Sequence, residues 1–66
     1  MKLNLAKIDL ALARSKRAKG VVAERMGISA TRFSRLLQQI RNDEEVSPKN
    51  AGKLAEALEV DVSELI

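Results

Sequence analysis

The stretch from Lys19 to Leu37, KGVVAERMGISATRFSRLL, constrains the fold more than any other part of the chain. Apolar residues recur at helical spacing up to Met26, and Gly27 follows where a helix ends in a left-handed residue. Ser29 then offers its side-chain oxygen to the free N–H groups of a second helix. Two short helices joined by a tight turn that contains Gly form a helix-turn-helix, whose second helix enters the DNA major groove.

The second helix of this unit is amphipathic. Its apolar side chains fall on one face: Phe33, Leu36, Leu37 and Ile40. The opposite face has hydrogen-bonding side chains and no acid: Thr31, Arg35 and Gln38, with Arg32 and Gln39 on one flank. Because Arg can bond guanine and Gln can bond adenine in the major groove, this face fits the reading of bases. A solvated amphipathic helix also presents a polar face, and that alternative stays open.

Composition excludes several classes of function. The 66 residues predict one domain, residues 1–66, with a small core. Since the chain has neither Cys nor His, we expect no disulfide, no metal site, no cofactor and no enzyme activity. No apolar run approaches the ~20 residues of a membrane span, so we expect no membrane partner. No small-molecule ligand is evident, and the single aromatic residue argues against base stacking on single strands.

Charge is divided unevenly along the chain. Residues 1–41 hold ten Lys or Arg and two acids, for +8, and residues 42–66 hold two Lys and seven acids, for −5, which together give the net +3. A basic half that contains the helix-turn-helix fits a surface facing phosphates. Lys16, Arg17 and Lys19 bunch at the start of its first helix, so we expect them to contact the DNA backbone. Internal attraction between the two halves is the alternative explanation.

The rest of the chain is also helical in pattern. Helices are expected at residues 5–15, 19–26, 30–41 and 48–58, with a last turn capped by Asp61 and Glu64. Asn4 and the pair Ser47-Pro48 mark helix starts. Residues 41–45 form an expected polar loop, followed by the apolar anchor Val46. The first helix is expected to bury one stripe of side chains: Leu5, Ile8, Ala11 and Leu12.

Taken together, VAERMGIS, FSRLL and VSPKNAGKLAEALEVDVSELI resemble the Cro/C1-type helix-turn-helix family, also called the XRE family, over nearly the whole chain. The resemblance implies an all-α, compact five-helix, lambda-repressor-like domain with the helix-turn-helix at about residues 19–40. It implies a cytoplasmic, bacterial or phage-encoded regulator of transcription, Cro-like or repressor-type, that binds double-stranded DNA sequence-specifically. The family includes antitoxins, so a protein-interaction module that uses the acidic C-terminal half is the alternative.

The resemblance also assigns contacts. Base contacts are expected from the early part of the second helix: Ala30, Thr31, Arg32 and Arg35. For the DNA backbone the resemblance implies a contact from Lys19 alone. With the clustered charges and the polar residues of the second helix, the expected backbone contacts are Lys16, Arg17, Lys19, Ser29 and Gln38. Because one helix covers only a few base pairs, we expect a weak homodimer on a two-fold operator. The apolar candidates for its interface are Val60, Val62, Leu65 and Ile66, although Leu65 is expected to dock on its own core.

Four features depart from the family pattern. The family usually has Thr or Ser with Gln at the start of the second helix, where this chain has Ala18-Lys19. Lys16 and Glu59 stand where the family usually has Gly. The segment before Ser47 is longer and acidic, with residues 43–45 in a loop that often meets the DNA backbone in the family. Acids there disfavour that contact in this protein.

Overall fold

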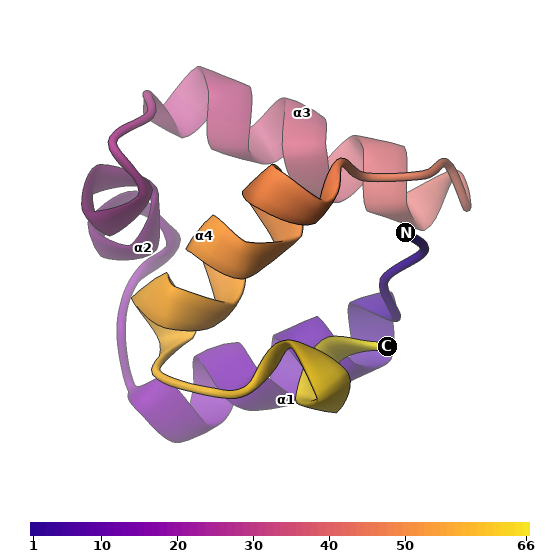
Figure 1. Ribbon diagram of the computed structural model, residues 1–66. Helices are drawn as coiled ribbons and strands as arrows, with labels where there is room; N and C mark the ends of the chain where they lie inside the picture. The colour runs from indigo at the N-terminus through magenta and orange to yellow at the C-terminus, as the bar shows by residue number, and fades with distance from the viewer.

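The chain folds into four α-helices and one 3-10 turn, and the computed structural model describes all residues from 1 to 66. The helices are α1 (Leu5–Ser15), α2 (Lys19–Met26), α3 (Ala30–Arg41) and α4 (Pro48–Leu58), followed by the turn η1 (Val62–Leu65). Figure 1 shows α4 in the middle of the molecule, with α3, α2 and α1 arranged around it. The expected all-α class is confirmed. None of the helices is long and apolar enough to cross a membrane.

The expected fifth helix is only a single 3-10 turn. The N–H of Glu64 donates to the carbonyl of Asp61 at 2.9 Å, three residues back, which is the 3-10 pattern. The predicted capping box is present, because the Asp61 side chain accepts from the Ser63 N–H and the Glu64 side chain accepts from the Asp61 N–H. The five-helix count is therefore corrected to four α-helices and a capped turn.

Side-chain caps begin three of the four α-helices, as predicted. Asn4, Ser29 and Ser47 each accept an N–H three residues ahead at 3.2 Å. Helix α2 is the exception, since its N-cap is Ala18 and no side chain caps it. The Ser15 hydroxyl instead donates to the Leu12 carbonyl and accepts from the Arg17 N–H, which closes the connection between α1 and α2.

The core contains 17 buried residues, all of them hydrophobic. The predicted stripe of α1 is confirmed at Ile8, Ala11 and Leu12, but Leu5 is only half-buried and Leu3 is buried in addition. Leu3 reaches the core because hydrogen bonds hold the extended segment before α1 on both sides. The Met1 carbonyl accepts from the Val46 N–H, and the Asn4 N–H donates to the Leu65 carbonyl, each at 2.7 Å.

Four residues adopt a left-handed backbone. Gly27 ends α2 with φ 74°, as predicted. Lys16 and Glu59 end α1 and α4 with φ 56° and 58°, and Asp43 follows α3 with φ 59°. Lys16 and Glu59 are the two positions where the family pattern has Gly. At both positions the chain has a left-handed helix end without Gly, the residue that adopts this conformation at least cost.

Candidate nucleic-acid interface

A tight turn of residues 27–29 fixes α2 against α3. The N–H of Gly27 donates to the Glu24 carbonyl and the N–H of Ile28 to the Ala23 carbonyl, both at 3.0 Å, so the end of α2 is closed. Ile28 is half-buried and packs against the core, and Ser29 starts α3. The two helices consequently emerge from the turn at an angle fixed by backbone hydrogen bonds and by buried apolar contacts.

Helix α3 presents the predicted residues to solvent. Its inner face is buried at Phe33, Leu36 and Ile40. The four residues assigned to base contacts are all exposed: Ala30, Thr31, Arg32 and Arg35. Ser29 and Gln38, which are assigned to the DNA backbone, are exposed as well. The guanidinium groups of Arg32 and Arg35 take part in none of the ion pairs or side-chain hydrogen bonds of the structure. Their donors are therefore free for an external partner.

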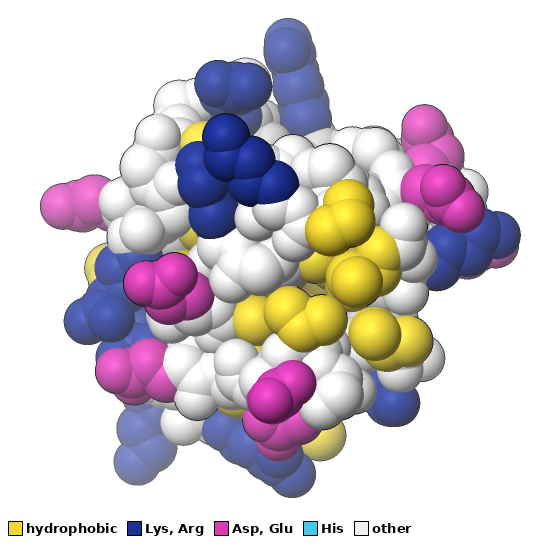
Figure 2. Space-filling model, in the orientation of Figure 1, with side chains coloured by type: hydrophobic (Ala, Val, Ile, Leu, Met, Phe, Trp, Pro, Cys, Tyr) yellow, Lys and Arg dark blue, Asp and Glu magenta, His cyan; other side chains and the backbone are white.

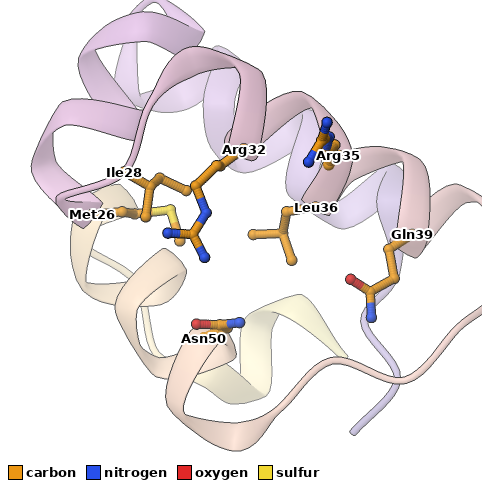
Figure 3. Close-up of a pocket in the computed structure, with 7 residues that line it drawn as sticks. All are labelled: Met26, Ile28, Arg32, Arg35, Leu36, Gln39 and Asn50. Carbon is orange, nitrogen blue, oxygen red and sulfur yellow. The ribbon is translucent and has the colours of Figure 1, made fainter.

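A cavity of about 260 Å³ lies between α3 and the start of α4 (Figure 3). Seven residues line it: Met26, Ile28, Arg32, Arg35, Leu36, Gln39 and Asn50. Figure 3 shows Arg32 extending from α3 toward Asn50 on α4, with Leu36 projecting into the space between the helices. The Gln39 side chain donates to the Glu45 carbonyl at 2.7 Å. This cavity places polar groups of α4 beside the polar flank of α3.

Asn50 and Gln39 line the cavity, although neither is among the predicted base or backbone contacts. Asn50 stands at the third position of α4, where the sequence indicates only a helix start. Asn50 lies beside Arg32 because α4 packs against α3. The spacing of apolar residues within one helix does not predict which residues of another helix lie next to it. For Gln39 a signal existed, since it shares the flank of α3 that carries Arg32.

The start of α2 has the second group of predicted contacts. Lys16 and Lys19 are both exposed. Since α2 has no side-chain cap, the N–H groups of Lys19 and Gly20 make no hydrogen bond within the chain. Free N–H groups at a helix start, together with the positive end of the helix dipole, favour an anion. The start of α2 thus has unused N–H donors, with the exposed side chains of Lys16 and Lys19 before and at it.

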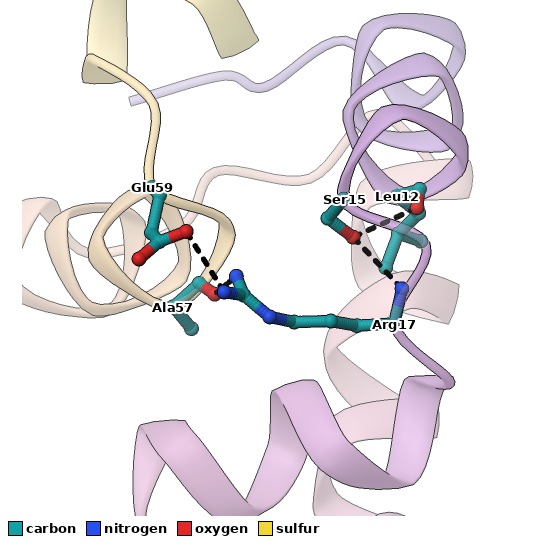
Figure 4. Close-up of polar contacts among 5 residues, drawn as sticks. All are labelled: Leu12, Ser15, Arg17, Ala57 and Glu59. Carbon is teal, nitrogen blue, oxygen red and sulfur yellow. Dashed lines mark hydrogen bonds and ion pairs between the residues drawn. The ribbon is translucent and has the colours of Figure 1, made fainter.

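Arg17 does not share this arrangement. Its guanidinium donates to the Ala57 carbonyl at 3.0 Å and to a Glu59 carboxylate oxygen at 2.8 Å (Figure 4). The Arg17 side chain is only 20% exposed. The hydrogen bond and charge of Arg17, with a smaller effect of the Arg25 charge, lower the pKa of Glu59 below its ordinary value. We therefore reassign Arg17 from the phosphate contacts to the packing of the α1–α2 connection against the end of α4.

The acidic loop (residues 43–45) folds back on the end of α3. The N–H groups of Asp43 and Glu44 donate to the carbonyls of Ile40 and Gln39, both at 3.0 Å. Asp43 also pairs with Lys2 at 3.2 Å, with both side chains exposed. Figure 2 shows basic side chains over α3 and acidic side chains beside its far end. The charge presented along α3 thus changes sign between its first turns and the loop that follows it.

No group of three or more His, Cys, Asp or Glu side chains is arranged to hold a metal ion. Comparison with protein-family models, with curated proteins and with solved structures finds no match to this chain. The resemblance to the Cro/C1-type family stays a prediction that rests on the motifs VAERMGIS, FSRLL and VSPKNAGKLAEALEVDVSELI.

Proposed function

We propose that the protein is a sequence-specific regulator of transcription that inserts α3 into the major groove of double-stranded DNA, as a Cro/C1-type, lambda-repressor-like domain does. The observation that carries this proposal is the pair of free guanidinium groups on Arg32 and Arg35. They project from a helix whose opposite face is buried at Phe33, Leu36 and Ile40, so their positions relative to the fold are restricted.

The residues divide into two roles. Base contacts come from the first two turns of α3, at Ala30, Thr31, Arg32 and Arg35, because Arg can form paired hydrogen bonds with guanine and Thr can contact a thymine methyl. Backbone contacts come from Lys16, Lys19, Ser29 and Gln38, together with the free N–H groups at the start of α2. Lys19, Ser29 and Gln38 belong to the α2–turn–α3 unit, whereas Lys16 ends α1, at the other end of the α1–α2 connection (Figure 1).

Two copies acting on a two-fold operator provide the discrimination that one helix lacks. Of the predicted interface residues, Leu65 is fully buried in its own core, as expected, while Ile66 is 52% exposed. Figure 2 shows hydrophobic side chains gathered between the start of α4 and the two chain ends. Met1, at the other chain end, is 37% exposed. A small apolar patch of this kind, with both acidic and basic side chains around it in Figure 2, favours a weak dimer that assembles on DNA.

Arg35→Ala tests the base-reading role. A preferred duplex is first selected from a random pool with the unchanged protein. The variant is expected to bind that duplex about 1–3 kcal/mol more weakly and to lose preference at one base position. Arg41→Ala, at the end of the same helix, is the matched control for removal of one exposed Arg. An unchanged ratio of specific to random binding in Arg35→Ala would exclude the role assigned to it.

Lys19→Gln tests the backbone role. It is expected to weaken specific and random binding alike and to reduce the salt dependence of log K by about one unit. Footprinting on the selected duplex, with the mass of the complex, tests the dimer. Protection of one half-site by one protein at saturation would contradict it.

A further inference from the structure

We propose that the cavity between α3 and α4 binds a small organic anion, namely a carboxylate with a compact apolar body, and that the bound anion displaces DNA. The binding itself is independent of the proposed function. The displacement of DNA rests on it, because it requires that Arg32 and Arg35 contact bases.

The rim of the cavity recognises negative charge. Arg32 and Arg35 contribute two guanidinium groups with no carboxylate partner, and the Asn50 side chain likewise makes no hydrogen bond within the chain. No acidic residue is among the seven that line the cavity. The fork of N–H donors on an Arg matches the two oxygens of a carboxylate. A rim of two Arg side chains therefore binds a planar carboxylate better than a Lys ammonium group does.

The floor of the cavity recognises an apolar body. Met26 and Leu36 are 6% and 7% exposed, and Ile28 is half-buried, so together they present a small apolar surface below the charged rim. A bare phosphate would leave this surface in contact with water. A ligand that covers it gains the hydrophobic contribution as well as the ionic one. The combination of charged rim and apolar floor selects an organic anion over an inorganic one.

The volume limits the size of the ligand. About 260 Å³ lies just below the range of about 300–1,000 Å³ that is usual for small-molecule sites. A single aromatic ring with one carboxylate is therefore of suitable size, and its ring can stack on a guanidinium plane. The ligand binds Arg32 and Arg35, which the proposed function assigns to base contacts. These two side chains therefore cannot bind the ligand and DNA at the same time.

Titration of the ¹⁵N-labelled protein with benzoate, followed by the amide shifts, tests the binding. Benzoate has about nine non-hydrogen atoms, and a Kd on the order of 1 mM is expected for so small a ligand. The shifts should concentrate on the residues that line the cavity. Benzamide, the neutral analogue, and inorganic phosphate, which lacks the apolar body, should each bind at least about fivefold more weakly. If benzamide binds as tightly as benzoate, the charged rim does not recognise the ligand. If phosphate binds as tightly, the apolar floor does not contribute to binding.

Two variants locate the site. Arg32→Gln should weaken benzoate binding about tenfold, which is the effect of losing one charge-assisted pair of hydrogen bonds. Arg41→Gln removes an exposed Arg from the same helix but outside the cavity, and it should bind benzoate as the unchanged protein does. Arg32 is exposed, so the fold should persist in the variant, and its amide spectrum reports this directly. Equal loss in both variants would show that benzoate senses only the net charge.

Competition tests the second half of the proposal. Sodium benzoate at 5 mM, compared with sodium chloride at 5 mM, should raise the apparent Kd for the selected duplex about sixfold if the Kd for benzoate is about 1 mM. Benzoate binding without competition would overturn the effector role alone. Benzoate binding by a protein that binds no duplex would overturn the proposed function and leave the anion site standing.

Discussion

Replacing Lys16 with Gly is expected to stabilise the fold and to weaken DNA binding at the same time. Lys16 is the C-cap of α1, with φ 56° and ψ 25°, and its N–H donates to the Ala13 carbonyl at 3.3 Å. The side chain is exposed and takes part in no ion pair. The residue therefore holds a left-handed backbone without a side-chain hydrogen bond or ion pair that offsets the cost.

The expected gain follows from two opposing terms. The left-handed conformation costs an ordinary L-residue about 1–2 kcal/mol, and Gly avoids this cost. Gly also gives the unfolded chain more freedom, which removes about 0.4–1 kcal/mol of the gain. With the middle of each range, about 1.5 less about 0.7 kcal/mol, a net stabilisation of about 0.5–1 kcal/mol remains. For a domain of this size, about 4–8 °C per kcal/mol converts this gain to a rise in Tm of about 2–8 °C.

Urea and thermal unfolding, followed by circular dichroism at the helix band, measure the gain. Lys16→Gln is the matched control, because it removes the charge and keeps a left-handed L-residue, so its stability should be unchanged. Both variants should lose the same affinity for random duplex, with a salt slope smaller by about one unit. The reasoning is refuted if the Gly variant is not stabilised, or if the Gln variant gains as much as the Gly variant.

Three further outcomes are expected from substitutions and from pH. Leu54→Ala removes a fully buried side chain and should cost about 2–5 kcal/mol in urea unfolding, with an exposed Leu10→Ala as the control near zero. Ser47→Ala removes the N-cap of α4 and should cost about 1 kcal/mol by the same assay. Because Arg17 lowers the pKa of Glu59, the pair contributes stability above pH 4.5, the ordinary value, and this contribution is lost as pH falls through the lower folded value. Acid titration of Glu59→Gln should accordingly show a shallower loss of stability, and an unchanged acid limb would contradict the pairing.

Helix starts and ends were predictable because their causes are local. Ser29 and Ser47 cap helices through an N–H three residues ahead, and Gly27 turns left-handed directly after α2. In each case the residue and its partner lie within one turn in the sequence. The last turn shows the limit of this approach, since Asp61 and Glu64 predicted its cap correctly but not that it is a 3-10 turn.

Features that depend on packing between distant segments were not predictable. Leu3 lies outside every helix and is 7% exposed, because hydrogen bonds to the loop and to the C-terminal turn hold its segment on the core. Asn50 faces Arg32 only because α4 begins beside the flank of α3. Helical periodicity describes one helix at a time, so it gave the exposed face of α3 but not the groups that α4 places next to it.

The pairing of Arg17 with Glu59 shows how one such contact changes an electrostatic argument. By charge alone, Arg17 is equivalent to Lys16 and Lys19, and all three were predicted to face phosphate. Glu59 stands where the family pattern has Gly, and its carboxylate neutralises Arg17 at 2.8 Å. Since each phosphate contact contributes about 0.9 to the slope of log K against log salt, removing Arg17 from the interface lowers the expected slope by about that amount. The ion pair between Arg17 and Glu59, which joins the start of α2 to the end of α4, thus lowers the non-specific attraction for DNA that the charge count predicts.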